Sequence, residues 1–218
     1  MKTAKRFAML AGLALALMAV LSFTGCNGKG GIAKAAPESD FEFKLSEDGT
    51  FVIITDYNGN AKNLVIPETI QGVPVASIDG FANNEKIKSV VIPSSVKVIC
   101  YQAFKNCTAL EKVTLPEGLL FIEDGAFGKT ALTSVTVPKS LLYIGYAAFG
   151  SDNLSEINIP DDAAFIGTNE YAELSKAFYG SKIDSSVELQ KKLNGIKQNY
   201  QFTDDFYKEH EELYKYLN

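Results

Sequence analysis

The sequence predicts a β-dominated solenoid, in which short coils of chain stack on one another and each coil contributes one parallel strand. Three observations lead to this fold. Five prolines recur at intervals of 26, 23, 22 and 22 residues, an apolar-x-apolar triplet precedes each proline, and an Ile and then an Ala-Phe pair follow it. Periods of about 20 to 50 residues are typical of stacked repeats, because one such unit cannot bury its own apolar face.

The repeat keeps its register over residues 64–183, which gives about five units. The prolines are Pro67, Pro93, Pro116, Pro138 and Pro160, and the Ile stands six residues after four of them, at Ile99, Ile122, Ile144 and Ile166. The Phe follows after five more residues, at Phe104, Phe127 and Phe149. An insertion at 71–75 delays the first unit's Ile and Phe to Ile78 and Phe81, and the last unit delays its pair to Ala177-Phe178.

Each triplet predicts a short strand with two buried residues flanking an exposed one, because side chains alternate along a strand. The proline ends the strand, since it has no N–H for the ladder. Stacking places equivalent residues about 4.8 Å apart. The same positions of successive coils therefore form continuous columns.

The first 25 residues predict a signal peptide. A basic start precedes a 15-residue apolar run, Phe7 to Leu21, which is shorter than the ~20 residues of a membrane span. The following segment up to Cys26 resembles the lipobox of bacterial lipoproteins, with Phe23 in place of the usual Leu. The resemblance implies lipidation at Cys26, with simple secretion or a retained membrane anchor as alternatives. Residues 26–39, rich in Gly, Ala and Lys, predict a flexible lipid-anchored tether.

A cap is expected at each end of the stack, because unpaired strand edges invite further strand addition. Residues 40–63 predict an N-terminal β-hairpin cap, with Glu47-Asp48-Gly49 as its turn. Residues 184–218 predict a helical C-terminal cap, which a capping box opens at Ser185.

Charge and composition exclude several functions. The 21 basic and 26 acidic residues give a net charge of −5, which disfavours a nucleic-acid partner because there is no basic excess to neutralise phosphates. A single His allows no His cluster for a metal or for catalysis. We therefore expect no cofactor, no metal site and no small-molecule substrate. Cys100 and Cys107 are expected to be small buried side chains, with a disulfide between them as the alternative in an exported protein.

The repeat unit L-x-x-V-x-V-P-x-x-L-x-x-I-x-x-x-A-F, together with Asn106-Cys107 after Ala103-Phe104, resembles the BspA-type leucine-rich repeat. The resemblance covers about residues 40–183. It implies a leucine-rich-repeat solenoid of the α/β horseshoe-like class, β-dominated, in a secreted or surface protein of bacteria. Members of that family with known roles are adhesins that bind host or bacterial surface proteins.

The candidate catalytic groups have simpler explanations. His210-Glu211-Glu212 begins like the helix of a zinc protease, but Tyr214 stands where the second His is needed. Three acidic pairs are more simply explained as turn or helix-start residues; they are Glu123-Asp124, Asp161-Asp162 and Asp204-Asp205. An enzyme is therefore not expected.

Two columns are candidate ligand-binding surfaces. The first consists of the residues just before each Ile: Val98, Phe121, Tyr143 and Phe165. Exposed aromatics in this arrangement favour a docking stripe, although they could instead stack on one another or on the C-terminal cap. The second consists of the middle residues of the triplets: Val65, Val91, Thr114, Thr136 and Asn158. It suits either a protein-binding sheet face or a plain soluble one.

Two functions remain open at this point. The first is a non-enzymatic, adhesin-like surface lipoprotein with a protein ligand, anchored in the bacterial cell envelope through lipid. The second is a structural or accessory envelope protein that binds another bacterial component. Both use the same fold and the same anchor, so the sequence does not separate them.

Overall fold

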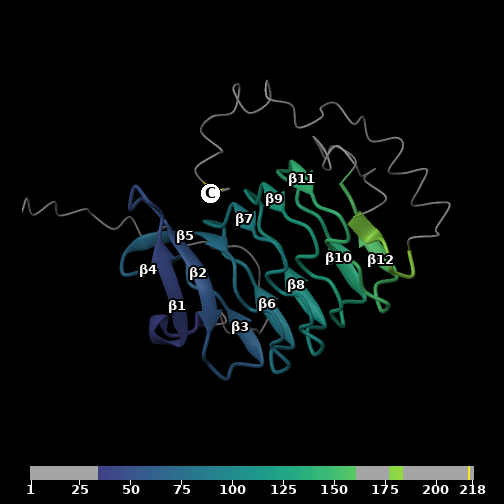
Figure 1. Ribbon diagram of the computed structural model, residues 1–218, viewed down its shortest axis with the longest axis horizontal. Coiled ribbons are helices and arrows are strands. Elements are labelled where there is room, and N and C mark those ends of the chain that lie inside the picture. The colour runs from purple at the N-terminus through teal and green to yellow at the C-terminus, as the bar shows by residue number, and fades with distance from the viewer. Residues whose placement is uncertain (1–33, 161–176, 184–215, 217–218) are drawn as a thin grey trace, which may run out of the picture. The chain divides into compact units, whose positions relative to one another are not determined.

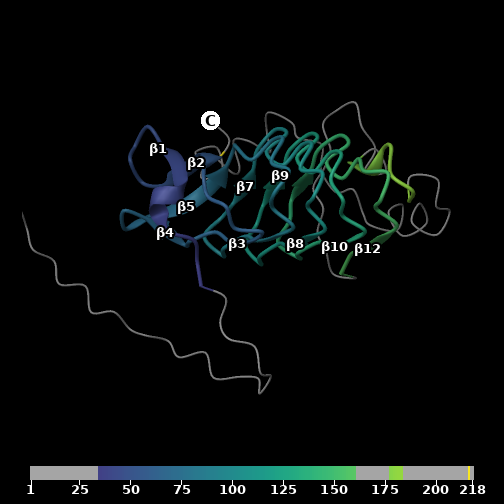
Figure 2. The same cartoon turned by 90° about the horizontal axis from the view of Figure 1, so that it is seen from below.

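The computed structural model describes residues 34–160, 177–183 and 216. These residues belong to one compact unit and form a β-solenoid of about five coils. Its strands run side by side in two rows (Figure 1 and Figure 2). The prediction of stacked, β-dominated coils with parallel strands is confirmed.

Each of the first four coils contributes two short strands, so the prediction of one strand per coil is wrong. The first row holds the triplet strands β3 (Asn63–Val65), β6 (Ser89–Val91), β8 (Lys112–Thr114), β10 (Ser134–Thr136) and β12 (Glu156–Asn158). The second row holds β5 (Val73–Ile78), β7 (Val98–Ile99), β9 (Phe121–Ile122) and β11 (Tyr143–Ile144). In these four coils the Ile that follows the proline and the residue before it are extended at the same phase and pair in parallel with the neighbouring coil.

The triplet strands show the predicted alternation of burial. Val135 and Val137 are buried, and Thr136 between them is exposed. Val113 in the coil before is half-buried and aligns with Val90 of β6. The inner face of this row therefore faces the core, and its outer face meets solvent.

A ladder of stacked aromatic rings forms the centre of the core. It runs through Tyr57, Phe81, Phe104, Phe127, Phe149 and Phe178, with neighbouring ring centroids between 4.8 and 5.9 Å apart. Phe81 stacks on Phe104 and Phe178 stacks on Phe149. This confirms that they are the Phe residues of the first and last repeat units, which the sequence places later than in the other units. Each coil is thus joined to the next through one buried ring.

The first row is divided into two sheets, β3-β6-β8 and β10-β12. The division coincides with a change in loop length. Five residues separate Phe104 from Leu110, before β8, whereas four separate Phe127 from Leu132, before β10. The second row pairs β9 with β11 across the same boundary. We call this boundary in the first row the seam.

At the N-terminal end, β1 (Phe41–Leu45) pairs antiparallel with β2 (Val52–Tyr57), with a bulge between Glu42 and Phe43. Strand β2 then pairs in parallel with β5 of the first coil. The insertion predicted at 71–75 forms a small antiparallel pair between β4 (Thr69–Ile70) and β5. Its two loop residues, Gln71 and Gly72, both have positive φ, as a tight hairpin turn requires.

The helical structure among the described residues is of the 3-10 type, in η1 (Glu38–Asp40) and at Ala177 and Phe178. The predicted signal peptide, Cys26, the tether up to residue 33 and Ile166 lie outside the described residues. The predicted helical cap at 184–218 also lies outside them, apart from Tyr216. The prediction of a flexible tether is wrong for its last residues, because Ala36 donates its N–H to Val65 O at 2.9 Å and Glu38 accepts the Gln71 N–H at 2.9 Å.

Candidate functional site

The aromatic column is aligned as predicted but is not an exposed stripe. Phe121 pairs in register with Val98 on one side and with Tyr143 on the other. Val98 is 0% exposed and Phe121 is 1% exposed, while Tyr143 is half-buried. The predicted exposure is therefore wrong for Val98 and Phe121. Phe165 lies outside the described residues.

The strands that pair with the second row help to explain why Val98 and Phe121 are buried. Across this row Ile53 aligns with Ser77, and Ser77 aligns with Val98, so the column begins in the N-terminal strands. There Tyr216 packs on a small apolar cluster that includes Phe51, and the two ring centroids are 5.3 Å apart. The outer side of this row is thus a packed surface, which favours the alternative of internal stacking.

The second column has the predicted exposure. Thr114, Thr136 and Asn158 are exposed, Val91 is exposed and Val65 is half-buried. Asn158 donates from Nδ2 to Oε1 of Glu156 at 3.3 Å, within β12. Small and mostly polar side chains therefore form this outer face.

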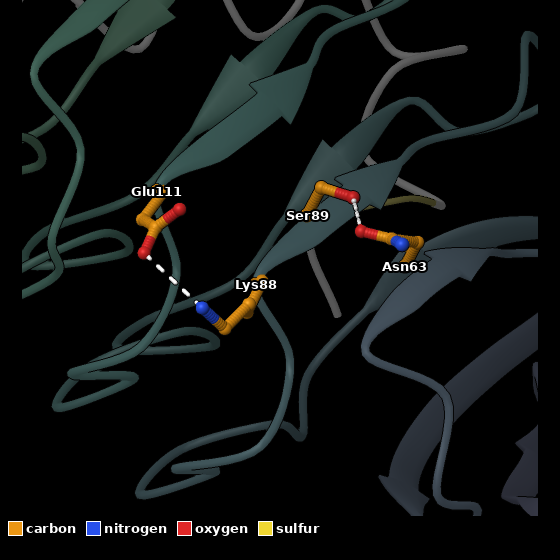
Figure 3. Close-up of polar contacts among 4 residues, drawn as sticks. All are labelled: Asn63, Lys88, Ser89 and Glu111. Carbon is orange, nitrogen blue, oxygen red and sulfur yellow. Dashed lines mark hydrogen bonds and ion pairs between the residues drawn. The ribbon is translucent and has the colours of Figure 1, made fainter.

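Polar contacts link neighbouring coils along one margin of this face (Figure 3). The Ser89 hydroxyl donates to Oδ1 of Asn63 at 2.8 Å, from β6 to β3. One coil further, Lys88 Nζ lies 3.6 Å from Oε1 of Glu111. Both side chains of this ion pair are more than half exposed, so the pair adds little to stability. Its charges stay accessible to a partner.

A groove of about 730 Å³ opens on the turns that follow the second row, and the sequence argument missed it. Three exposed tyrosines border it, Tyr101, Tyr146 and Tyr179, which are 60%, 41% and 51% exposed. The rings of Tyr146 and Tyr179 stack with centroids 5.6 Å apart. Among the described residues, these three account for most of the large hydrophobic side chains that are strongly exposed.

The groove exists because two neighbouring coils carry small residues on this edge. Gly125 and Gly128 line it, where the preceding coil carries Gln102 and Lys105 at the equivalent positions. The next coil, which carries Tyr146, also has small residues at these positions, Ala147 and Gly150. The signal in the sequence was this run of small residues between exposed tyrosines. This run is hard to recognise in the sequence because the residues at the turn positions vary from coil to coil more than the core residues do.

The paired acids Glu123 and Asp124 act as turn caps. Glu123 accepts the Tyr101 N–H at 2.6 Å, and Asp124 accepts the Tyr146 N–H at 2.7 Å. Burial raises the pKa of Glu123 above its usual value, against the hydrogen bond from Tyr101, and the nearby Asp79 and Asp124 raise it further. Both carboxylates thus have structural partners one coil away.

The two described cysteines are free thiols; Cys107 is buried, as predicted, whereas Cys100 is half-buried. Burial raises the pKa of Cys100 to about 12 and that of Cys107 to about 11. Cys107 donates to the carbonyl oxygen of Phe81 at 3.0 Å, and the sulfur of Cys100 lies 3.1 Å from the Ser77 hydroxyl. A thiol with such a pKa is protonated at neutral pH and is a poor nucleophile.

The described residues contain neither a metal-binding cluster nor a helix that could span a membrane. No group of three or more His, Cys, Asp or Glu side chains is placed to hold a metal ion there. In the same part of the chain, no helix has the length and hydropathy of a membrane span. His210 and the acidic pairs at 161–162 and 204–205 lie outside the described residues.

Comparison with known proteins gives the family. A model of the BspA type leucine rich repeat region matches residues 77–205 in six copies. The crystal structure of a leucine rich repeat protein from T. pallidum is similar to this chain at 30% identity and a TM-score of 0.50, and the match covers 62% of this chain and 71% of that one. A leucine-rich repeat protein from Bacteroides capillosus matches at 24% identity and a TM-score of 0.49, over 56% of this chain and 94% of that one. No protein of curated function matches the sequence. With its repeat register and stacked coils, the chain belongs to the BspA-type leucine-rich-repeat family.

Proposed function

We propose that the protein is a non-enzymatic, adhesin-like protein-binding module displayed on the bacterial cell surface. The observation that carries this proposal is the outer face of the first row. Every coil presents a short strand there, and from β6 to β12 the last residue of the strand is exposed, at Val91, Thr114, Thr136 and Asn158. A rigid face of small side chains can receive another protein without losing much side-chain entropy.

The size of this face indicates which residues a partner must also contact. Five strands about 4.8 Å apart span ~19 Å, and three residues of strand span ~10 Å. A standard interface buries about 800 Å² on each partner, which is several times this area. A ligand must therefore also cover the margin of the face, where Lys88 and Glu111 form their exposed ion pair.

The anchor belongs to the same proposal. Cys26 would carry the lipid, and the residues between it and Lys34 would form a flexible tether that holds the solenoid away from the membrane. The antiparallel pair of β1 and β2 would act as the N-terminal cap, because it occupies the strand edge of the first coil. Residues 184–218 would form the C-terminal cap.

The test is a charge placed at the centre of the face. A ligand is first recovered with immobilised wild-type protein, and its affinity is then measured for Thr136→Arg and for Thr108→Arg. Thr108 is an exposed turn residue outside the face, so its variant matches the change in charge and size. We expect Thr136→Arg to weaken binding at least tenfold, because the arginine prevents close contact across the face, and Thr108→Arg to bind normally. Equal binding by both variants would exclude this face.

The second candidate is a structural or accessory protein of the cell envelope, which would use the same face toward another bacterial component. Protease shaving of intact cells separates the two functions. A surface adhesin is cleaved and lost from intact cells, whereas complete protection would remove the adhesin proposal and leave the envelope role.

A further inference from the structure

The groove between the exposed tyrosines has a floor whose backbone donors are already used. Gly125 donates its N–H to Tyr146 O at 2.9 Å, and Gly128 donates to Gly125 O at 2.9 Å. Lys129 donates to the carbonyl oxygen of Gly150 at 2.8 Å. A peptide that added itself as a strand would need free backbone groups of this kind. A ligand of the groove must therefore be recognised by side chains.

The charges that line the groove cancel. Lys105 and Lys129 supply two positive charges, and Asp124 and Asp152 supply two negative ones. A phosphate or a strongly charged peptide would find no net attractive field in such a site. The lining therefore favours a neutral ligand.

The remaining side chains combine aromatic surface with hydrogen-bonding groups. Tyr101 stands on one coil and Tyr146 stands two coils further on, about 10 Å away at the usual strand spacing. Between these coils, Asp124 is held in place by the N–H of Tyr146 and, at 3.3 Å, by the hydroxyl of Tyr143. The hydroxyl of Tyr101 accepts a hydrogen bond from Gln102 at 2.7 Å. Carboxylate and amide oxygens beside aromatic rings are suited to a ligand that has both hydroxyl groups and C–H faces.

We propose that this groove is a binding site for a neutral oligosaccharide. A pyranose ring presents a C–H face, which an aromatic ring attracts through its negative π-surface. Its hydroxyls can donate to Asp124 and exchange hydrogen bonds with Gln102 and Asn153, which also line the groove. The glycines of the floor leave room for a sugar chain to lie across the edge of the solenoid. This site lies on the turns, apart from the sheet face proposed for protein binding.

The experiment uses the purified protein and three neutral probes: linear tetrasaccharides of glucose, of mannose and of N-acetylglucosamine. Binding is followed by titration calorimetry and by saturation-transfer NMR. A heparin fragment and a lysine tetrapeptide serve as charged probes. We expect saturable binding of at least one neutral probe with a dissociation constant between micromolar and millimolar, and weaker binding of both charged probes.

Two variants test the location of the site. Tyr146→Ala removes one aromatic wall and should weaken binding about tenfold. Gly125→Gln fills the floor with the residue that the preceding coil carries at the equivalent position, Gln102, where the backbone also has a positive φ. The repeat accommodates Gln there, so the variant should fold and yet bind at least tenfold more weakly. Leu45→Ala, at an exposed apolar residue outside the groove, is the control and should bind normally.

Three results would overturn the proposal: no saturable binding of any neutral probe at millimolar concentration, stronger binding of a charged probe, or unchanged binding by both groove variants. Thermal melting of each variant shows whether it is folded. If Tyr146→Ala does not fold, Gly125→Gln alone decides the location. Because the sheet-face variant Thr136→Arg does not touch the groove, it should bind the oligosaccharide normally, and failure of one proposed site leaves the other unaffected.

Discussion

Replacing Phe127 tests whether the aromatic ladder holds the coils together. Phe127 is 0% exposed and stacks on Phe104 and Phe149 with centroids 5.2 and 5.3 Å away and planes within 5° of parallel. Truncating a buried Phe to Ala costs about 3 to 5 kcal/mol of unfolding free energy through lost burial and the cavity that remains. Each lost ring pair accounts for roughly 0.5 to 1.5 kcal/mol. We expect Phe127→Ala to lose at least ~3 kcal/mol.

The assay is urea unfolding followed by circular dichroism. Tyr101→Ala removes an equally large ring from an exposed position and should change stability by less than about 0.5 kcal/mol. A single domain has only about 5 to 15 kcal/mol to lose, so Phe127→Leu, which fills more of the cavity, provides an intermediate measurement if the Ala variant does not fold. A loss below about 1 kcal/mol for Phe127→Ala, or equal losses for Phe127→Ala and Tyr101→Ala, would refute the ladder as the main support of the core.

Three further predictions concern other parts of the chain. Phe121→Ala should lower unfolding free energy by ~3 kcal/mol in the same urea assay and leave binding of a protein ligand unchanged, because this ring is buried; lost binding at full stability would restore the docking stripe. Glu123→Gln should flatten the dependence of Tm on pH: the raised pKa of Glu123 means that its stabilising effect is present below its unfolded-state pKa and is lost as the pH rises through the folded-state value. Gln still accepts the Tyr101 N–H, so a variant with the wild-type pH profile of Tm from 4 to 8 would contradict this assignment. Cys26→Ala should release the protein from the membrane fraction on cell fractionation if Cys26 carries lipid, and unchanged membrane partitioning would exclude that anchor.

The core could be predicted from the sequence because every coil repeats it. Phe104, Phe127 and Phe149 stand at the same position of successive repeats. Because stacked coils place equivalent residues side by side, a large apolar residue that recurs at one position is expected to be buried between the coils. Even the displaced Phe178 could be assigned, since the preceding Ala keeps the pattern. Burial within a coil is therefore a local property of the repeat.

The surface could not be predicted in the same way, because burial on the outside depends on what other segments cover. Phe121 follows the outward side of its strand, and the sequence gives no direct sign that this side is packed. Tyr216 lies far away along the chain from Phe51, yet the two rings are in contact. The groove beside Tyr146 was missed for a related reason: its shape comes from side chains that are absent at Gly125 and Gly128, and a search for recurring residues does not find absences.

The seam between β8 and β10 has a mechanical consequence. A force along the stack is shared at the first two coil boundaries by two hydrogen-bonded ladders, but at the seam the first row has no ladder pairing among the described strands. The load there passes through β9 and β11, the turns and the contact of Phe127 with Phe149. Under tension the solenoid would open first between β8 and β10, on the side of the triplet strands. It would bend at that point, while the stacked rings of the aromatic ladder stay in contact. A protein with coils of one length throughout would have no such preferred bending point.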